Sequence, residues 1–215
     1  MDPADAPEER PATRTQVEHL RRVVLTVAGL NAGYFVVEFA VALVAGSVAL
    51  LADSVDFLED TSVNLLIAMA LSWSLARRAW MGKAMAVIIL GPAVVAGVEA
   101  IQRFGDPTAP RVVPLVLASL GAIAVNGTCA WLLTSVRQHG GSLSRAAFLS
   151  ARNDVLVNLA IIAMGFVTLW TGSGWPDLVL GCFIILLAFR AAWEVWEVSE
   201  EERLAAKALA GEVID

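Results

Sequence analysis

Residues 48–72 read VALLADSVDFLEDTSVNLLIAMALS, a stretch as apolar as a membrane span that nevertheless contains four acids. A transmembrane helix needs about 20 residues, so the stretch is long enough to cross a bilayer. A carboxylate inside a bilayer is costly and persists mostly where it meets a partner, a water path or an ion. We therefore expect residues 48–72 to form a transmembrane helix whose acids serve a function.

The polar side chains of this stretch fall on one face of the expected helix, and residues 144–170 repeat the pattern. Successive members of each set are three or four positions apart, the spacing that aligns side chains along one side of an α-helix. The sets are Asp53, Asp56, Asp60 and Asn64 in the first stretch and Ser150, Asp154 and Asn158 in the second, with Asn153 beside them. Asp60 and Asp154 each lie near the middle of their stretch, so two oxygen-lined faces can meet at one depth.

Facing oxygen ligands at one depth are typical of a cation site. A divalent ion needs several ligands at about 2.0–2.6 Å, and positions i and i+4 of one helix supply two of them. Carboxylates also bind protons, so a proton can displace the metal from such a site. The two faces therefore predict a divalent-cation site between the second and the fifth span, with proton-coupled exchange as its chemistry.

Further polar residues lie within the expected spans. Glu38 and Asn31 share a face of the first span, and they either line the ion path or form hydrogen bonds between helices. The auxiliary cation path that we expect comprises Asp53, Asn64, Asn153, Asn158 and Glu38. Glu59 and Arg152 each point away from the acid face of their helix, and our hypothesis is that they form an ion pair.

The composition of the whole chain is that of a membrane protein. Of its 215 residues 58% are hydrophobic and 17% are charged, whereas globular proteins are about 25% charged. The mean hydropathy is +0.70. A net charge of -6 without a basic patch excludes nucleic-acid binding as the main function. Cys129 and Cys182 are isolated within apolar runs, which argues against a disulfide scaffold.

Six long apolar stretches predict an all-α, polytopic membrane protein with six transmembrane helices. They cover about residues 23–44, 48–72, 84–102, 112–136, 144–170 and 177–195. None shows the alternation with period 2 that is typical of barrel strands. We expect three parts: a disordered segment, 1–18, a six-helix transport domain, 19–197, and a short acidic cytoplasmic tail, 198–215, which continues the last helix and frays.

Basic residues predict that both termini are cytoplasmic, because cytoplasmic loops carry an excess of Lys and Arg. In a six-pass chain Arg103 and Arg111 fall on the outer side. The basic residues on the other side are Arg21, Arg22, Arg77, Arg78, Lys83, Arg137 and Arg145. We expect a multi-pass protein of the plasma (inner) membrane.

With these residues in place, the sequence resembles the cation diffusion facilitator family over about residues 20–197. The strongest stretch runs from Asn31 to Asp60 and includes Gly46-Ser47-Val48-Ala49-Leu50-Leu51-Ala52-Asp53. A second runs from Ala147-Phe148-Leu149-Ser150 to Asp154 and is followed by Trp175-Pro176-Asp177. The resemblance implies a six-helix, proton-coupled exporter of divalent transition metals, usually a homodimer. It also implies the metal ligands, which are Asp56, Asp60, Ser150 and Asp154.

The chain departs from the family pattern in three places. Zinc-carrying members typically have His where Ser150 stands, and the loss of an imidazole makes a harder site that favours manganese, iron(II), cobalt or magnesium. Members usually continue after the sixth helix into a cytoplasmic metal-binding domain, for which this chain leaves no room, so we expect dimer contacts in the membrane part. The link Arg137-Gln138-His139-Gly140-Gly141 stands where many members have a histidine-rich loop.

The sequence thus predicts a transporter in the lipid bilayer that exports divalent metal from the cytoplasm in exchange for protons. The metal is substrate rather than prosthetic group, and zinc, cobalt, manganese, iron and cadmium all remain open. The alternative is a cation-binding accessory or non-transporting membrane protein of the same fold. An enzyme is not expected: Asp56-Phe57 lacks the Asp-Gly step of lipid-head-group transferases, and Arg152-Asn153-Asp154 lacks the Gly-x-Gly-Asp of intramembrane proteases.

Overall fold

The computed structural model describes residues 14–136 and 141–211, without the side chains of 141–145. These residues form long α-helices and no strands, so the predicted all-α class is confirmed. The helices are α1 (Arg14–Ala45), α2 (Val48–Ala70), α3 (Leu75–Arg103), α4 (Val112–Thr134), α5 (Gly141–Thr171) and α6 (Trp175–Ala210). Residues 137–140, with Arg137 and His139, lie outside the described part, as does the Arg145 side chain.

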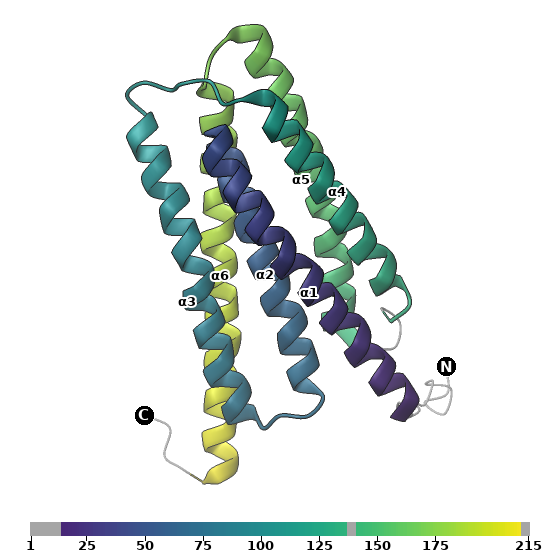
Figure 1. Ribbon diagram of the computed structural model, residues 1–215. Helices are drawn as coiled ribbons and strands as arrows, with labels where there is room; N and C mark the ends of the chain where they lie inside the picture. Colours follow the sequence, from purple (N-terminus) through teal and green to yellow (C-terminus); the bar gives the residue numbers. More distant parts are fainter. Residues whose placement is uncertain (1–13, 137–140, 212–215) are drawn as a thin grey trace, which may run out of the picture.

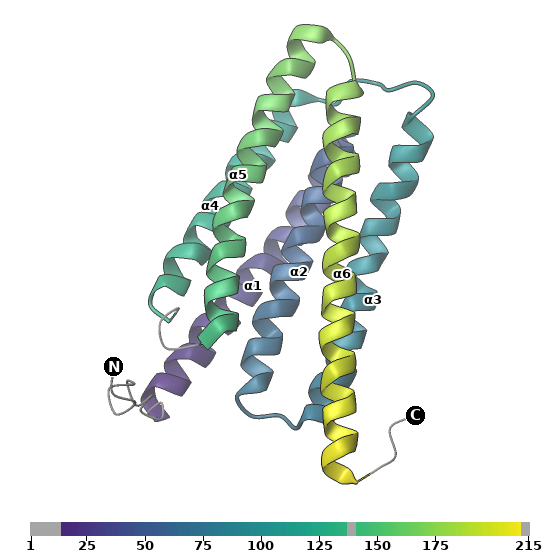
Figure 2. The same ribbon diagram turned by 180° about the vertical axis from the view of Figure 1, so that it is seen from behind.

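The helices run up and down in one bundle, with α2 at its centre (Figures 1 and 2). α3 packs along α6 and α4 packs along α5, while α2 contacts α1, α3, α5 and α6. The first turn of α1 and the last turn of α6 lie at the same end of the bundle, which we call the terminal end. The opposite end carries the short links between α1 and α2, α3 and α4, and α5 and α6.

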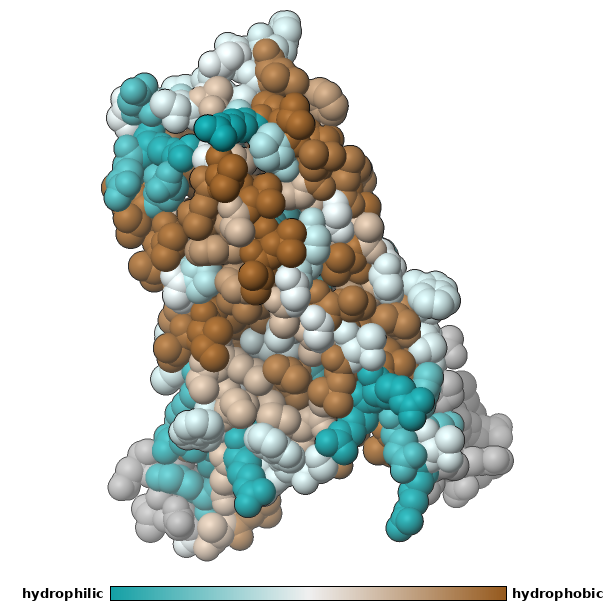
Figure 3. All heavy atoms as spheres, viewed as in Figure 1, coloured by the Kyte–Doolittle hydropathy of each residue, from teal (hydrophilic) through white to brown (hydrophobic). Residues whose placement is uncertain are grey.

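Five of the helices are long and apolar enough to cross a membrane, and α2 is the exception. α2 has the necessary length, but its four acids make it too polar by composition. Its position explains how the acids are tolerated, because four neighbouring helices shield it from lipid. Apolar side chains instead cover much of the middle of the visible face, and hydrophilic ones gather toward its ends (Figure 3).

Three helices extend beyond the apolar stretches from which they were predicted. α1 begins at Arg14 rather than near residue 23, and so includes residues expected in the disordered segment. α3 begins at Leu75 rather than near residue 84, and α6 continues to Ala210. Apolar residues mark only the part of a helix that lies in lipid, whereas ion pairs extend α3 and α6 together at the terminal end. These pairs join Arg78 to Glu202 and Lys83 to Glu200.

The end opposite the termini is closed by a buried hydrogen-bond network. Asp177, in the first turn of α6, accepts hydrogen bonds from the Ser47 hydroxyl at 2.5 Å and the Val48 N–H at 2.8 Å. It therefore caps the N-terminus of α2. Gly46 makes the preceding turn with a φ of +67°, and Arg103 donates to its carbonyl oxygen. Ser47 and Asp177 are each only 2% exposed, so we call this the closed end.

Candidate functional site

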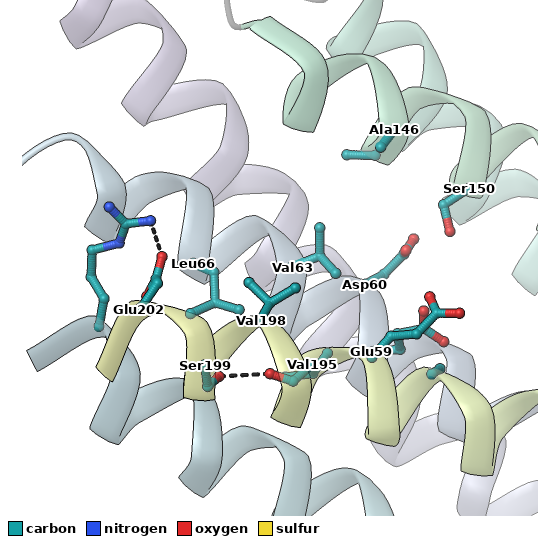
Figure 4. A pocket seen from close by; sticks show the side chains of 14 residues that line it. Glu59, Asp60, Val63, Leu66, Ala146, Ser150, Val195, Val198, Ser199 and Glu202 are labelled. Atoms are coloured by element: carbon teal, nitrogen blue, oxygen red, sulfur yellow. Dashed lines mark hydrogen bonds and ion pairs between the residues drawn. The ribbon is translucent and has the colours of Figure 1, made fainter. Parts of the chain in front are cut away.

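A pocket of about 280 Å³ lies in the half of the bundle nearer the terminal end, between α2, α5 and α6. Its inner part is lined by Glu59 and Asp60 of α2 and by Ser150 of α5 (Figure 4). Arg78 of α3 and Glu202 of α6, which form an ion pair, line it nearer the terminal end. The pocket thus connects the terminal end with the polar faces of α2 and α5.

Asp60 and Ser150 come from helices that are far apart in sequence, yet their oxygens point toward one another (Figure 4). Asp60 is only 4% exposed, and Ser150 is half-buried. Asn64, one turn further along α2, donates its amide to the Asp60 carbonyl oxygen at 2.8 Å. Asn158 does the same for the Asp154 carbonyl oxygen of α5, at 3.1 Å. Each amide therefore forms a hydrogen bond with the backbone of its own helix, at the residue that carries the acid.

Asp56 and Asp154 lie between α2 and α5 and are half-buried. Their carboxylates are close enough to repel one another, and Asp154 is also within electrostatic range of Asp60. In this conformation no three Asp, Glu, His or Cys side chains of the described part come together closely enough to hold a metal. The ligand set of Asp56, Asp60, Ser150 and Asp154 therefore stays a prediction. Two of its members, Asp60 and Ser150, line the same pocket.

Glu59 lies at the pocket and does not pair with Arg152. It lines the pocket and is within electrostatic range of Glu194. Arg152 is exposed and contacts the side-chain oxygen of its neighbour Asn153 at 3.4 Å, so the hypothesis of a Glu59–Arg152 ion pair is wrong. Asn153 is exposed as well, on the outer side of α5.

The pocket gathers acids that the sequence analysis did not assign to it. Glu194 and Glu202 of α6 join Glu59 and Asp60, and Arg78 is the one basic side chain among the described lining residues. The spacing of eight residues between Glu194 and Glu202 places them on one face of α6, and this spacing is the signal that could have linked them. An acid-lined pocket raises the local concentration of cations.

Comparisons with known proteins show which family the sequence matches. Residues 83–198 match the family described as "Cation efflux transmembrane domain". The zinc transporter ZitB of Escherichia coli (strain K12) is 31% identical over 85% of this chain and 62% of its own length. ZitB of Pectobacterium atrosepticum is 28% identical over 81% of this chain and 58% of its own.

The chain is also similar to a relative whose name specifies several metals. The "Cadmium, cobalt and zinc/H(+)-K(+) antiporter" of Bacillus subtilis (strain 168) is 25% identical over 81% of this chain and 60% of its own length. The chain thus spans about three fifths of the length of the relatives that it matches.

Proposed function

Because the chain belongs to the cation efflux family, we propose that it carries divalent metal cations across a membrane in exchange for protons. The ion enters the pocket from the terminal end and binds between α2 and α5, on Asp56, Asp60 and Asp154 with Ser150 beside them. A change in helix packing then exposes it at the closed end, where protons displace it and reset the site.

The observation that carries this proposal is the one-sided access to the acids. The pocket extends from Asp60 toward Arg78 and Glu202 near the terminal end, whereas at the other end Ser47 and Asp177 form a buried hydrogen bond. A carrier must expose its site to one side at a time, and a bundle open at one end has the form of one such state. A protein that only binds a cation needs no closed end, so the geometry favours transport over an accessory role.

The position of basic side chains supports a cytoplasmic terminal end. Arg21, Arg22, Arg77 and Lys83 lie near that end, and Arg103 and Arg111 lie at the other. In this orientation the chain is an exporter, with both termini cytoplasmic in the plasma (inner) membrane. We extend the proposal to a homodimer that associates through the membrane part.

The choice of metal follows from the ligand types. Asp56, Asp60, Ser150 and Asp154 offer only oxygen, whereas zinc is suited by imidazole and thiolate ligands. The names of the relatives specify zinc, cadmium and cobalt. We propose that this chain accepts such ions and binds the harder ions manganese, iron(II) and cobalt relatively better than a site with an imidazole would.

The test is metal-driven proton flux in proteoliposomes that contain the purified chain and a pH-sensitive dye. Zinc, cadmium, cobalt and manganese gradients are expected to drive flux, and Asp60→Asn and Asp154→Asn are expected to abolish it. Glu99→Gln is the matched control, because Glu99 is an acid at the closed end whose partner is Arg103. Flux that survives in both Asn variants would refute the site, and metal binding without flux in the parent chain would favour the accessory protein.

A further inference from the structure

A second group of buried oxygens lies closer to the closed end than the pocket does. It comprises Glu38 of α1, Asp53 of α2 and Asn158 of α5. Asp53 precedes Asp60 by seven residues, which is about 10 Å along a helix. The carboxylates of Glu38 and Asp53 interact, and the Asn158 side chain reaches Asp53. Three helices therefore contribute to one polar group deep in the bundle.

None of the side-chain oxygens of this group has a hydrogen-bond partner. Both oxygens of Glu38, both oxygens of Asp53 and the amide oxygen of Asn158 are buried and unpaired. The three residues are at most 1% exposed. Buried polar atoms are nearly always hydrogen bonded, and a buried carboxylate without a partner is more costly still. Five unpaired oxygens in one place indicate that something other than a side chain satisfies them.

Two donors near the pair form hydrogen bonds to backbone carbonyl oxygens. The hydroxyl of Tyr34, one turn before Glu38 on α1, donates to the Ala118 carbonyl oxygen at 2.6 Å. The amide nitrogen of Asn158 donates one of its two N–H groups to the Asp154 carbonyl oxygen, and the same side chain reaches Asp53. Among the described residues, no Lys, Arg or His forms an ion pair with Glu38 or Asp53. The protein itself therefore leaves the charge of this pair uncompensated.

We infer that Glu38, Asp53 and Asn158 form a second binding site for a divalent cation. Carboxylate and amide oxygens are the ligands that hard divalent ions prefer. One divalent ion neutralises both carboxylates, whereas a monovalent ion leaves a net negative charge in a region of low dielectric constant. The site lies between the pocket and the closed end, so it is the next position for an ion that leaves Asp60. That transit role rests on the proposed function, but binding does not.

Equilibrium titration with Mn²⁺ tests the inference, using the purified full chain in lipid nanodiscs and free Mn²⁺ measured by electron paramagnetic resonance. The parent chain and the control Glu99→Gln are expected to bind two ions per chain. Glu38→Gln and Asp53→Asn are each expected to lose one ion, with affinity at that site at least about tenfold weaker, or 1.4 kcal/mol. Asp60→Asn is expected to lose the other ion.

Two results would overturn the second site. One is an unchanged number of bound ions in both Glu38→Gln and Asp53→Asn, with each variant shown to be folded by its melting curve. The other is displacement of the Glu38-dependent ion when KCl replaces choline chloride, which would assign the site to a monovalent cation. The proposed function is tested separately, by proton flux. A chain that binds two Mn²⁺ ions but shows no proton flux would keep the second site, and that site would lose only its transit role.

Discussion

The network at the closed end gives the most direct prediction, the replacement of Asp177 by Ala. Asp177 joins the start of α6 to the start of α2, through the Ser47 hydroxyl and the backbone N–H groups of Val48 and Ala49. Ser47 in turn accepts a hydrogen bond from the Leu50 N–H at 3.0 Å. Removing the carboxylate leaves the first N–H groups of α2 buried without a partner, since α2 has no acid in its first turn.

The magnitude follows from the geometry. A hydrogen bond to a charged group contributes about 1.5–3 kcal/mol. Two of the three bonds are short, at 2.5 and 2.8 Å, and the third, at 3.3 Å, is weaker. Asp177→Ala is therefore expected to cost at least ~3 kcal/mol. In a chain of this size that loss corresponds to a decrease of about 6–12 °C in melting temperature. Asp177→Asn retains one acceptor oxygen and is expected to lose about half as much.

The assay is the thermal melting of purified variants in one detergent, followed by circular dichroism and by aggregation. Glu99→Gln is the control at the same end, where a half-exposed ion pair with Arg103 is worth at most about 1 kcal/mol. The expected order of melting temperatures is parent, Glu99→Gln, Asp177→Asn and Asp177→Ala. If Asp177→Ala melts no lower than Glu99→Gln, Asp177 does not hold α2 to α6 and the closed end is closed by something else.

Two further predictions concern packing and charge. Gly181→Ala places a methyl group 2.6 Å from the Val48 side chain and 2.8 Å from the Ala49 nitrogen, and it is expected to lower the free energy of unfolding by about 1–3 kcal/mol. Gly127→Ala, with open space around it, is expected to leave the melting temperature unchanged or higher. Equal melting temperatures of the two variants would contradict the close contact of α2 and α6. Arg78→Gln removes the one basic side chain among the described lining residues of the pocket. Relative to the parent chain, its Mn²⁺ affinity is expected to be several-fold higher at low salt and less increased at high salt. A ratio of the two affinities that does not change with salt would show that Arg78 does not act on the ion through its charge.

The polar faces of α2 and α5 could be predicted because the period of a helix is fixed. Knowing that residues 48–72 are helical is enough to place Asp53 and Asp60 on one side, whatever packs against them. The burial of Glu38 and Asp53 could not be predicted in the same way, since it depends on which faces of α1 and α2 meet. The sequence analysis therefore left Glu38 with two interpretations, and the structure places it with both oxygens unpaired.

The closed end escaped prediction for the same reason. Ser47 and Asp177 are 130 residues apart, and nothing in either segment indicates that the first turn of α6 caps α2. Trp175-Pro176-Asp177 could be assigned only to the family resemblance, just before the last span. The Glu59–Arg152 hypothesis failed because it paired two residues by their charge alone. In the fold, Glu59 lies within electrostatic range of Glu194 of α6, and like charges are brought together in the pocket.

The positions of the polar contacts constrain how the proposed transport cycle can proceed. α3 and α6 are joined at the terminal end by Arg78–Glu202 and Lys83–Glu200, so these two helices can move as one unit. At the closed end, the hydrogen bonds between the start of α6 and the start of α2 in the described part of the chain are those of Asp177. If the closed end opens between α2 and α6, the Asp177 hydrogen bonds must break, at a cost of at least ~3 kcal/mol. Each 1.4 kcal/mol is a factor of ten in population, so Asp177 keeps the open form more than about a hundredfold rarer than it would otherwise be. In the proposed transport cycle, the carboxylate that stabilises the fold is therefore also the group that restrains release of the ion.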